Sequence, residues 1–190
     1  MKNMLIGIII AVLCNITLVA QNKYPDYYSN IKTVKGDKIT FSVEKKSSWL
    51  QVYNSFNTHD RLRAFYRADG TRYFPGAYID DTIFRKALYS TFSIERAKFL
   101  FNSREGAMWI TYIIDSKTGK TLEVYFSLDY LQDDYENAVL SMTPLELETF
   151  EMNIKKFMIW KVPKDFKEAA YCIMSHSVGV LEEDEESDDE

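Results

Sequence analysis

The sequence predicts an α+β fold, in which an antiparallel sheet carries two helices on one face and an extra β-rich segment at its N-terminal end. Two apolar runs, rich in aromatic and β-branched residues, flank the turn at 116–119, which is typical of a β-hairpin. Residues 143–157 combine a helix cap with apolar residues at helical spacing. Strand patterns precede and follow these elements, so a sheet covered by helices on one face is the economical packing.

The first twenty residues have the features of an export signal. Lys2 is followed by the apolar run at 4–13, and Ala20 provides a small residue at the expected cleavage point. The run is shorter than the roughly 20 residues that a membrane span needs. We therefore expect an exported protein, periplasmic or secreted from a Gram-negative bacterium, with no stable membrane span after cleavage. Retention of residues 4–20 as a membrane anchor is the alternative, and lipidation at Cys14 is a weaker one, because the residue before it, Leu13, is not small.

Composition and charge divide the remaining chain into three parts. A polar lead-in at 21–36 precedes a single domain at 37–181. Residues 182–190 hold eight of the 28 acidic residues, and charge of this density predicts a disordered tail. Because 22 basic and 20 acidic residues remain at 21–181, the expected folded part is close to neutral.

The N-terminal part of the domain has the patterns of strands. Residues 37–44 alternate between apolar and polar side chains, which is typical of a half-buried strand. A second strand is predicted at 48–56. Two aromatic runs at 62–74 surround Asp69-Gly70, a turn sequence that favours a hairpin.

Helical spacing follows this strand-rich part. Asp80 or Asp81 can cap a first helix, and a second turn or short helix is predicted from Ser93.

The helix at 143–157 is the clearest of the chain. Thr143 and Glu146 predict a capping box, with a proline at the first helical position. Glu151 and Lys155 are expected to form an ion pair on its solvent side.

The hairpin at 108–126 is expected in the centre of the sheet, because both faces of its first strand are largely apolar. One of these faces carries Trp109, Thr111 and Ile113. A final strand at 169–178 completes the sheet. Cys172 lies on this strand and is the one cysteine left after cleavage, so we expect a buried apolar residue and no internal disulfide.

Four short elements at about 74–178 occur in the order seen in a known family: Phe92-Ser93, Ala97, Gly119 and Trp160-Lys161-Val162-Pro163. They resemble the Tyr-Pro, alanine, hairpin-glycine and Trp-x-Pro elements of the C-terminal domain of TonB-type energy transducers. The resemblance implies a TonB-C-like fold. The chain departs from the family in having only four prolines, where the family has a long proline-rich spacer, and residues 37–73 have no counterpart. Energy transduction is therefore not implied.

Catalytic, metal and nucleic-acid sites lack support in the sequence. His59 and His176 are far apart, so no zinc site and no other cofactor is expected. The segment at 116–121 has no first glycine of a phosphate loop and leads into a strand, which argues against nucleotide binding. No basic patch interleaved with aromatic residues indicates nucleic-acid binding.

These exclusions favour an exported, non-enzymatic interaction module that binds a protein partner or a second copy of itself. The strand at 169–178 is the candidate sheet edge, because it contains no proline that would block pairing. The candidate binding residues on it are Tyr171, Ile173 and Ser175.

Three alternatives remain open. With its anchor retained, the protein would be a component of a TonB-like energy transducer. A glycan- or surface-binding protein would use exposed aromatic residues, for which the candidates are Tyr27, Tyr28, Tyr130 and Tyr135. A hydrolase would need convergent carboxylates, for which the candidates are Asp80, Asp81, Asp133 and Asp134.

Overall fold

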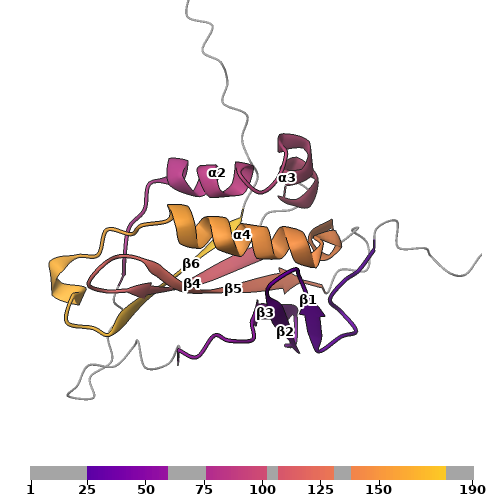
Figure 1. The fold of residues 1–190 in the computed structure, drawn as a ribbon, viewed down its shortest axis with the longest axis horizontal. Helices are drawn as coiled ribbons and strands as arrows, with labels where there is room; N and C mark the ends of the chain where they lie inside the picture. The colour runs from indigo at the N-terminus through magenta and orange to yellow at the C-terminus, as the bar shows by residue number, and fades with distance from the viewer. Residues whose placement is uncertain (1–24, 60–75, 102–106, 131–137, 179–190) are drawn as a thin grey trace, which may run out of the picture.

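Six strands of one antiparallel sheet form the base of the fold (Figure 1). The computed structural model describes residues 25–59, 76–101, 107–130 and 138–178; the expected signal peptide, the hairpin at 62–74 and the acidic tail lie outside them. In spatial order the strands are β1 (Thr33–Lys35), β2 (Thr40–Lys45), β3 (Trp49–Asn54), β5 (Thr121–Asp129), β4 (Met108–Asp115) and β6 (Tyr171–Val178). The hairpin β4–β5 is central, as predicted.

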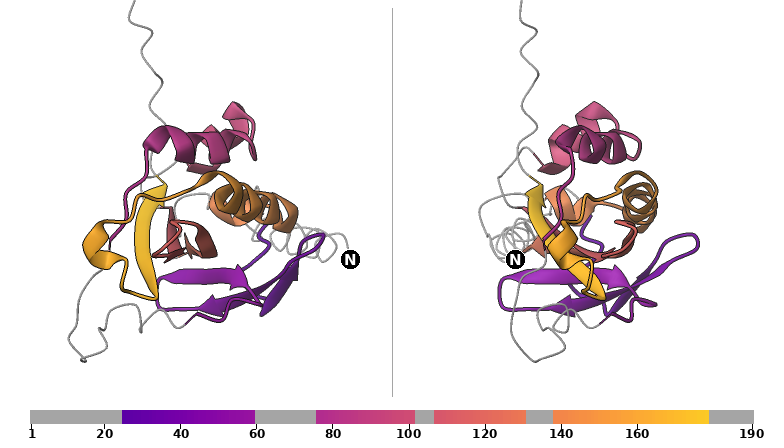
Figure 2. Two further views of the ribbon diagram at one scale, coloured as in Figure 1. Left: turned by 60° about the vertical axis from the view of Figure 1, so that its left-hand side comes forward. Right: turned by 90° about the vertical axis from the view of Figure 1, so that its left-hand side faces the viewer.

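The helices lie on one side of this sheet. They are α2 (Asp81–Tyr89), α3 (Ile94–Phe101) and α4 (Pro144–Phe157), with short 3-10 helices at Ala138–Ser141 and Lys164–Phe166. Figure 2 shows α4 next to the sheet and α2 and α3 farther from it. The predicted α+β class is confirmed, with a third α-helix because the turn or short helix predicted from Ser93 is an α-helix of eight residues, Ile94–Phe101. No helix within the described ranges is long and apolar enough to cross a membrane.

The helix starts follow from their cap residues. The Asp80 side chain accepts a hydrogen bond from the backbone N–H of Thr82 and so caps α2. At α4, the Thr143 hydroxyl accepts from the Glu146 N–H, and the Glu146 carboxylate accepts from the Thr143 N–H. The predicted capping box is therefore confirmed.

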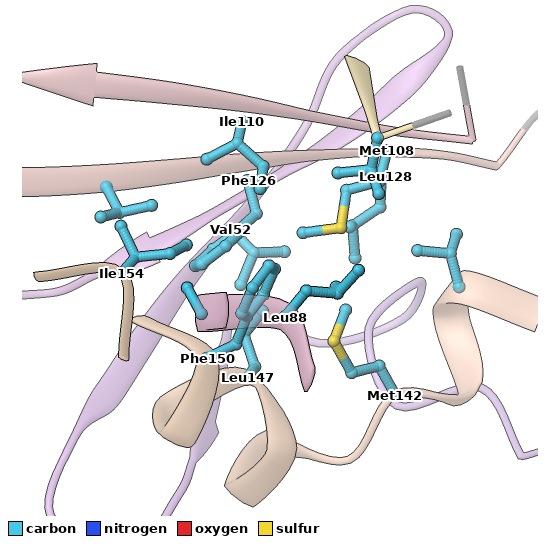
Figure 3. Close-up of a cluster of buried hydrophobic side chains, with 14 of the residues drawn as sticks. Val52, Leu88, Met108, Ile110, Phe126, Leu128, Met142, Leu147, Phe150 and Ile154 are labelled. Carbon is cyan, nitrogen blue, oxygen red and sulfur yellow. The ribbon is translucent and has the colours of Figure 1, made fainter. Parts of the chain in front are cut away.

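The core lies between α4 and the sheet. Figure 3 shows Phe150 and Leu147 of α4 directed at Val52, Phe126 and Leu128 of the central strands, and all five are fully buried. The Phe150 ring also packs against the rings of aromatic residues from α2, the α2–α3 turn and β5, namely Phe84, Phe92 and Phe126. Truncating a buried phenylalanine of this kind costs about 3–5 kcal/mol, so this ring is a main contact that stabilises α4 on the sheet.

The turn between β4 and β5 depends on a glycine. Gly119 has a φ of +72°, the left-handed conformation that glycine adopts without strain. Its carbonyl accepts a hydrogen bond of 2.8 Å from the backbone N–H of Trp160. A Cβ at this position would overlap the Trp160 carbonyl oxygen, so the hairpin tip requires glycine for two separate reasons.

The predicted ion pair on α4 forms, but its predicted solvent exposure is wrong. Lys155 Nζ lies 2.6 Å from Glu151 Oε1, whereas the Glu151 side chain is fully buried and its Oε2 has no hydrogen-bond partner. One turn earlier, the buried Glu148 carboxylate accepts hydrogen bonds from the backbone N–H groups of Lys38 and Ile39. The β1–β2 turn therefore covers the side of α4 that periodicity assigns to solvent.

The predicted lead-in at 21–36 is also more ordered than expected from its polarity. It contains β1, and Tyr28 is fully buried. The Tyr28 hydroxyl donates a hydrogen bond of 2.8 Å to the carbonyl of Met142, and burial raises the pKa of this phenol. This residue anchors the start of the described chain next to α4.

Gly119→Ala tests the hairpin constraint. We expect it to lower the free energy of unfolding by about 2 kcal/mol or more, through backbone strain and the clash with Trp160. Gly76→Ala is the matched control, because its Cβ would meet only Met174 Sδ at 3.9 Å. Urea unfolding of both variants measures the difference, and equal stabilities would contradict the account of the turn.

Glu151→Gln tests the buried carboxylate. Burial raises the pKa of Glu151 despite the nearby Lys155. Protonation of Glu151 therefore favours the folded state. The stability that this protonation adds is fully present below the unfolded pKa near 4.5, and it is lost as the pH rises through the folded pKa. The stability of the wild type relative to Glu151→Gln should therefore fall with rising pH. Glu146 is the control, because hydrogen bonds from Arg96 and Thr143 together outweigh burial and lower its pKa. The stability of the wild type relative to Glu146→Gln should therefore rise with rising pH.

Candidate functional site

Strand β6 forms one edge of the sheet. It pairs with β4 along its whole length, from Tyr171 opposite Asp115 to Val178 opposite Met108, and no other strand of the described chain pairs with it. Its eight residues include no proline, glycine or charged residue. Natural proteins usually protect edge strands with such residues, so β6 lacks the usual chemical barriers to strand pairing.

The predicted binding residues of β6 differ in exposure. Ser175 is exposed, and its hydroxyl lies 2.8 Å from that of Thr111 on β4. Ile173 is half-buried, and Tyr171 is buried against the His59 ring, with centroids 5.3 Å apart. All three project from the sheet face opposite the helices. The side chain at Tyr171 is thus part of the packing, and Ser175 is the accessible member of the set.

A groove runs beside β6 on the helical side of the sheet. Its volume is about 500 Å³. The residues that line it come from the segment before α2, from α2, from the chain after α4 and from β6: Ala77, Tyr78, Ile79, Asp81, Phe84, Arg85, Trp160, Met174, Ser175, His176, Ser177 and Val178. Tyr78 is 68% exposed at its rim. Aromatic and apolar side chains therefore line a hollow that adjoins the sheet edge.

His176 is the titratable group of β6 in this groove. Its ring stacks on Tyr112 with centroids 5.4 Å apart and meets the edge of Phe84 at 4.6 Å. Burial lowers the pKa of His176 more strongly than the Asp81 carboxylate raises it. The imidazole is therefore neutral at neutral pH. Where His176 lines the groove, it provides a polar group without a charge.

Within the described residues, the cysteine and the candidate carboxylates Asp80 and Asp81 have separate structural roles. Cys172 is buried, as predicted, and burial raises the pKa of its thiol to about 11. Asp80 binds Thr82 as a helix cap, and Asp81, the next residue, lies along the groove. These two carboxylates do not face each other across a pocket, and Asp133 and Asp134 lie outside the described residues. Within the described ranges no cluster of three or more His, Cys, Asp or Glu could hold a metal ion.

The three described tyrosines of the predicted glycan platform do not form one surface. Tyr28 is buried, which corrects the expectation of exposure, because its hydroxyl finds a partner at Met142. Tyr130 donates its hydroxyl to the carbonyl of Lys46 and packs at the edge of the core. Tyr27 is 36% exposed at the start of the described chain, and Tyr135 lies outside it.

A carboxylate–histidine pair on the outer face was not predicted. The nearly buried Glu123 of β5 lies 2.7 Å from His59 Nδ1 and accepts hydrogen bonds from the backbone N–H groups of Thr58 and His59. It also accepts from the Tyr125 hydroxyl at 2.9 Å. Hydrogen bonds led by His59 outweigh burial and lower the pKa of Glu123. In the sequence, the signal was an acidic residue within an otherwise apolar central strand.

The network around Glu123 fastens residues 57–59 to the sheet. Asn57 Nδ2 adds a hydrogen bond of 3.0 Å to the carbonyl of Val124. In the part of the chain that is described, the hydrogen-bond partner of the His59 ring is Glu123. The pair therefore anchors the end of this segment to β5.

The fold is similar to that of a solved protein of the DUF5043 family from Bacteroides uniformis ATCC 8492, with a TM-score of 0.62. The two sequences are 16% identical, and the match covers 83% of this chain and 96% of the other. At this identity the likeness shows the fold alone. No family model and no curated protein matches the chain. The resemblance to TonB-type domains is tested by none of these comparisons and stays a prediction.

Glu123→Ala tests the anchor. Loss of the carboxylate leaves the N–H groups of residues 58 and 59 and the Tyr125 hydroxyl without their acceptor, so we expect a loss of about 2–4 kcal/mol. Amide exchange at Thr58 and His59 should accelerate. Ser127→Ala, on the same face of β5, should change stability by less than about 0.5 kcal/mol. Unchanged exchange at residues 58 and 59 would contradict the anchoring role.

Proposed function

We propose that the chain is an exported, non-enzymatic interaction module that binds an extended segment of a partner protein by strand addition at β6. The observation that carries the proposal is the edge position of β6, an eight-residue strand with no proline, glycine or charged residue. Every second residue of a strand paired on one side directs its N–H and C=O groups away from its neighbour. These groups supply the hydrogen bonds of β-augmentation.

The groove beside β6 supports this mode of binding. Strand addition gives affinity through the main chain and specificity through pockets for alternate side chains. A strand added to β6 would direct every second side chain toward the helical side, where the groove begins. Phe84, Trp160 and Tyr78 make this hollow suited to an apolar or aromatic side chain.

The partner segment is expected to be neutral or mixed in charge at the groove. Asp81 and Arg85 of α2 both line it, so neither sign of charge is favoured. The same edge could pair with β6 of a second copy of the chain. Sedimentation velocity of the wild type over a range of concentrations distinguishes self-pairing from binding of another protein.

Ser175→Lys tests strand addition. Random extended peptides displayed on phage are selected against the wild type, and the selected peptides are then measured with the variants. A lysine at the exposed edge disfavours an incoming strand, so we expect at least about tenfold weaker binding, or about 1.4 kcal/mol. Ser90→Lys at the exposed end of α2 is the matched control and should leave the affinity unchanged.

The location of the bound peptide provides the decisive readout. Peptide binding should slow amide exchange in β6 more than in β1, the opposite edge of the sheet. Selected peptides that bind Ser175→Lys as tightly as the wild type, or that protect no amide of β6, would overturn the proposal.

A further inference from the structure

Two tryptophans project from the face of the sheet that the helices leave uncovered. Trp49 of β3 is 41% exposed and Trp109 of β4 is 49% exposed. The residues next to them along each strand, Leu50 and Met108, point to the opposite face and are fully buried in the core. Because side chains alternate along a strand, both indole rings stand on the outer face.

The strand register fixes the separation of these rings. Trp109 lies opposite Ser127 of β5, and Trp49 lies opposite Asp129, two residues farther along the same strand. Strands are about 4.8 Å apart and rise about 3.4 Å per residue, so the two Cα atoms are about 12 Å apart. Both residues lie on regular paired strands, so their spacing is set before any ligand binds.

The surface around the rings is polar and made of small side chains. Ser127 and Ser177 lie opposite Trp109 on its two neighbouring strands. Two residues farther along the paired strands β4 and β6, the hydroxyls of Thr111 and Ser175 lie 2.8 Å apart. The other end of the same face differs, because buried Ile113, Tyr125 and Tyr171 form a second small core there.

We infer that Trp49, Trp109 and the hydroxyl-bearing side chains between β3 and β6 form a binding platform for a neutral oligosaccharide. A pyranose ring presents a face of C–H groups, which packs on an indole, and a rim of hydroxyls, which bonds to serine and threonine. Two rings about 12 Å apart on a rigid sheet allow a short sugar chain to lie across both. We name Trp49 and Trp109, with the side chains between them, the tryptophan platform.

Charge and polarity favour this ligand over others. The side chains opposite Trp109 are uncharged, and an acidic residue, Asp129, lies opposite Trp49. Among the described residues, the positions of β5 and β6 paired with Trp49 and Trp109 carry no basic side chain, so an acidic glycan or a nucleic acid would meet this carboxylate without a positive charge at these positions opposite its own. A protein interface has a contiguous apolar centre, whereas serines flank Trp109 on both sides. The platform reaches β6 at Ser175 and Ser177, so only Trp49, on a strand three positions from β6 in the sheet, separates it from the β6 proposal.

The test begins with an array of neutral hexopyranose oligosaccharides, followed by calorimetry with the tightest binder. We expect a dissociation constant tighter than about 1 mM. Trp49→Ala and Trp109→Ala should each weaken binding by at least about tenfold, because each removes one stacking ring. Phe56→Ala is the matched control: Phe56 is 81% exposed, just after β3, and its loss should change the affinity less than twofold.

The three tryptophans of the chain give a direct spectroscopic readout. In a ¹⁵N spectrum the indole N–H signals of Trp49 and Trp109 should shift on titration. The signal of Trp160 should stay in place, because this ring is buried and its Nε1 donates to Thr121. Thermal unfolding of both alanine variants checks that the fold is intact.

The outcomes separate this inference from the β6 proposal. Trp49→Ala should bind the oligosaccharide at least about tenfold more weakly and still bind the peptides selected for β6 with unchanged affinity. The inference is overturned if no neutral oligosaccharide of the array binds, or if the bound sugar leaves the Trp49 and Trp109 signals unmoved. Binding that survives in both alanine variants would overturn it equally.

Discussion

The register of β4 against its two neighbours is the constraint on which the other features depend. β4 pairs with β5 on one side and with β6 on the other, and its alternate residues face two different environments. Met108, Ile110 and Tyr112 enter the core beneath α4, whereas Trp109 projects from the opposite face. A slip of one residue would exchange these two sets. The position of β6 at the edge and the spacing of the tryptophans follow from this single pairing.

Buried carboxylates bind the peripheral segments to this centre. Glu148 of α4 binds the β1–β2 turn, and Glu123 of β5 binds residues 58 and 59, each through backbone N–H groups. Both carboxylates are buried and carry several hydrogen bonds, so the loss of either leaves donors unpaired in a site closed to water. Glu151 differs because one of its oxygens has no partner and burial raises its pKa. The same helix therefore carries one carboxylate with hydrogen bonds to both oxygens and one whose pKa is raised by burial.

Local signals in the sequence predicted the elements well, and tertiary contacts explain the failures. The capping box at Thr143 and the hairpin glycine at 119 are properties of a few neighbouring residues, and both are confirmed. Burial of this side of α4 was missed because the turn that binds Glu148, one turn before Glu151, is more than 100 residues away in the sequence. Tyr28 was expected at the surface because its neighbours are polar, yet its partner is the distant Met142. The tryptophans were not singled out because a strand that is apolar on both faces does not show which face is covered.

The central claim is that β6 is an open edge next to a groove, and amide hydrogen exchange of the free protein tests it most directly. If β6 is bonded to β4 alone, every second amide of β6 should be protected, and the amides between them should exchange at rates close to those of unstructured chain. The amides of β5, which has a strand on each side, should all be protected. Uniform protection along β6, equal to that of β5, would show that another segment already occupies the edge and would contradict the account.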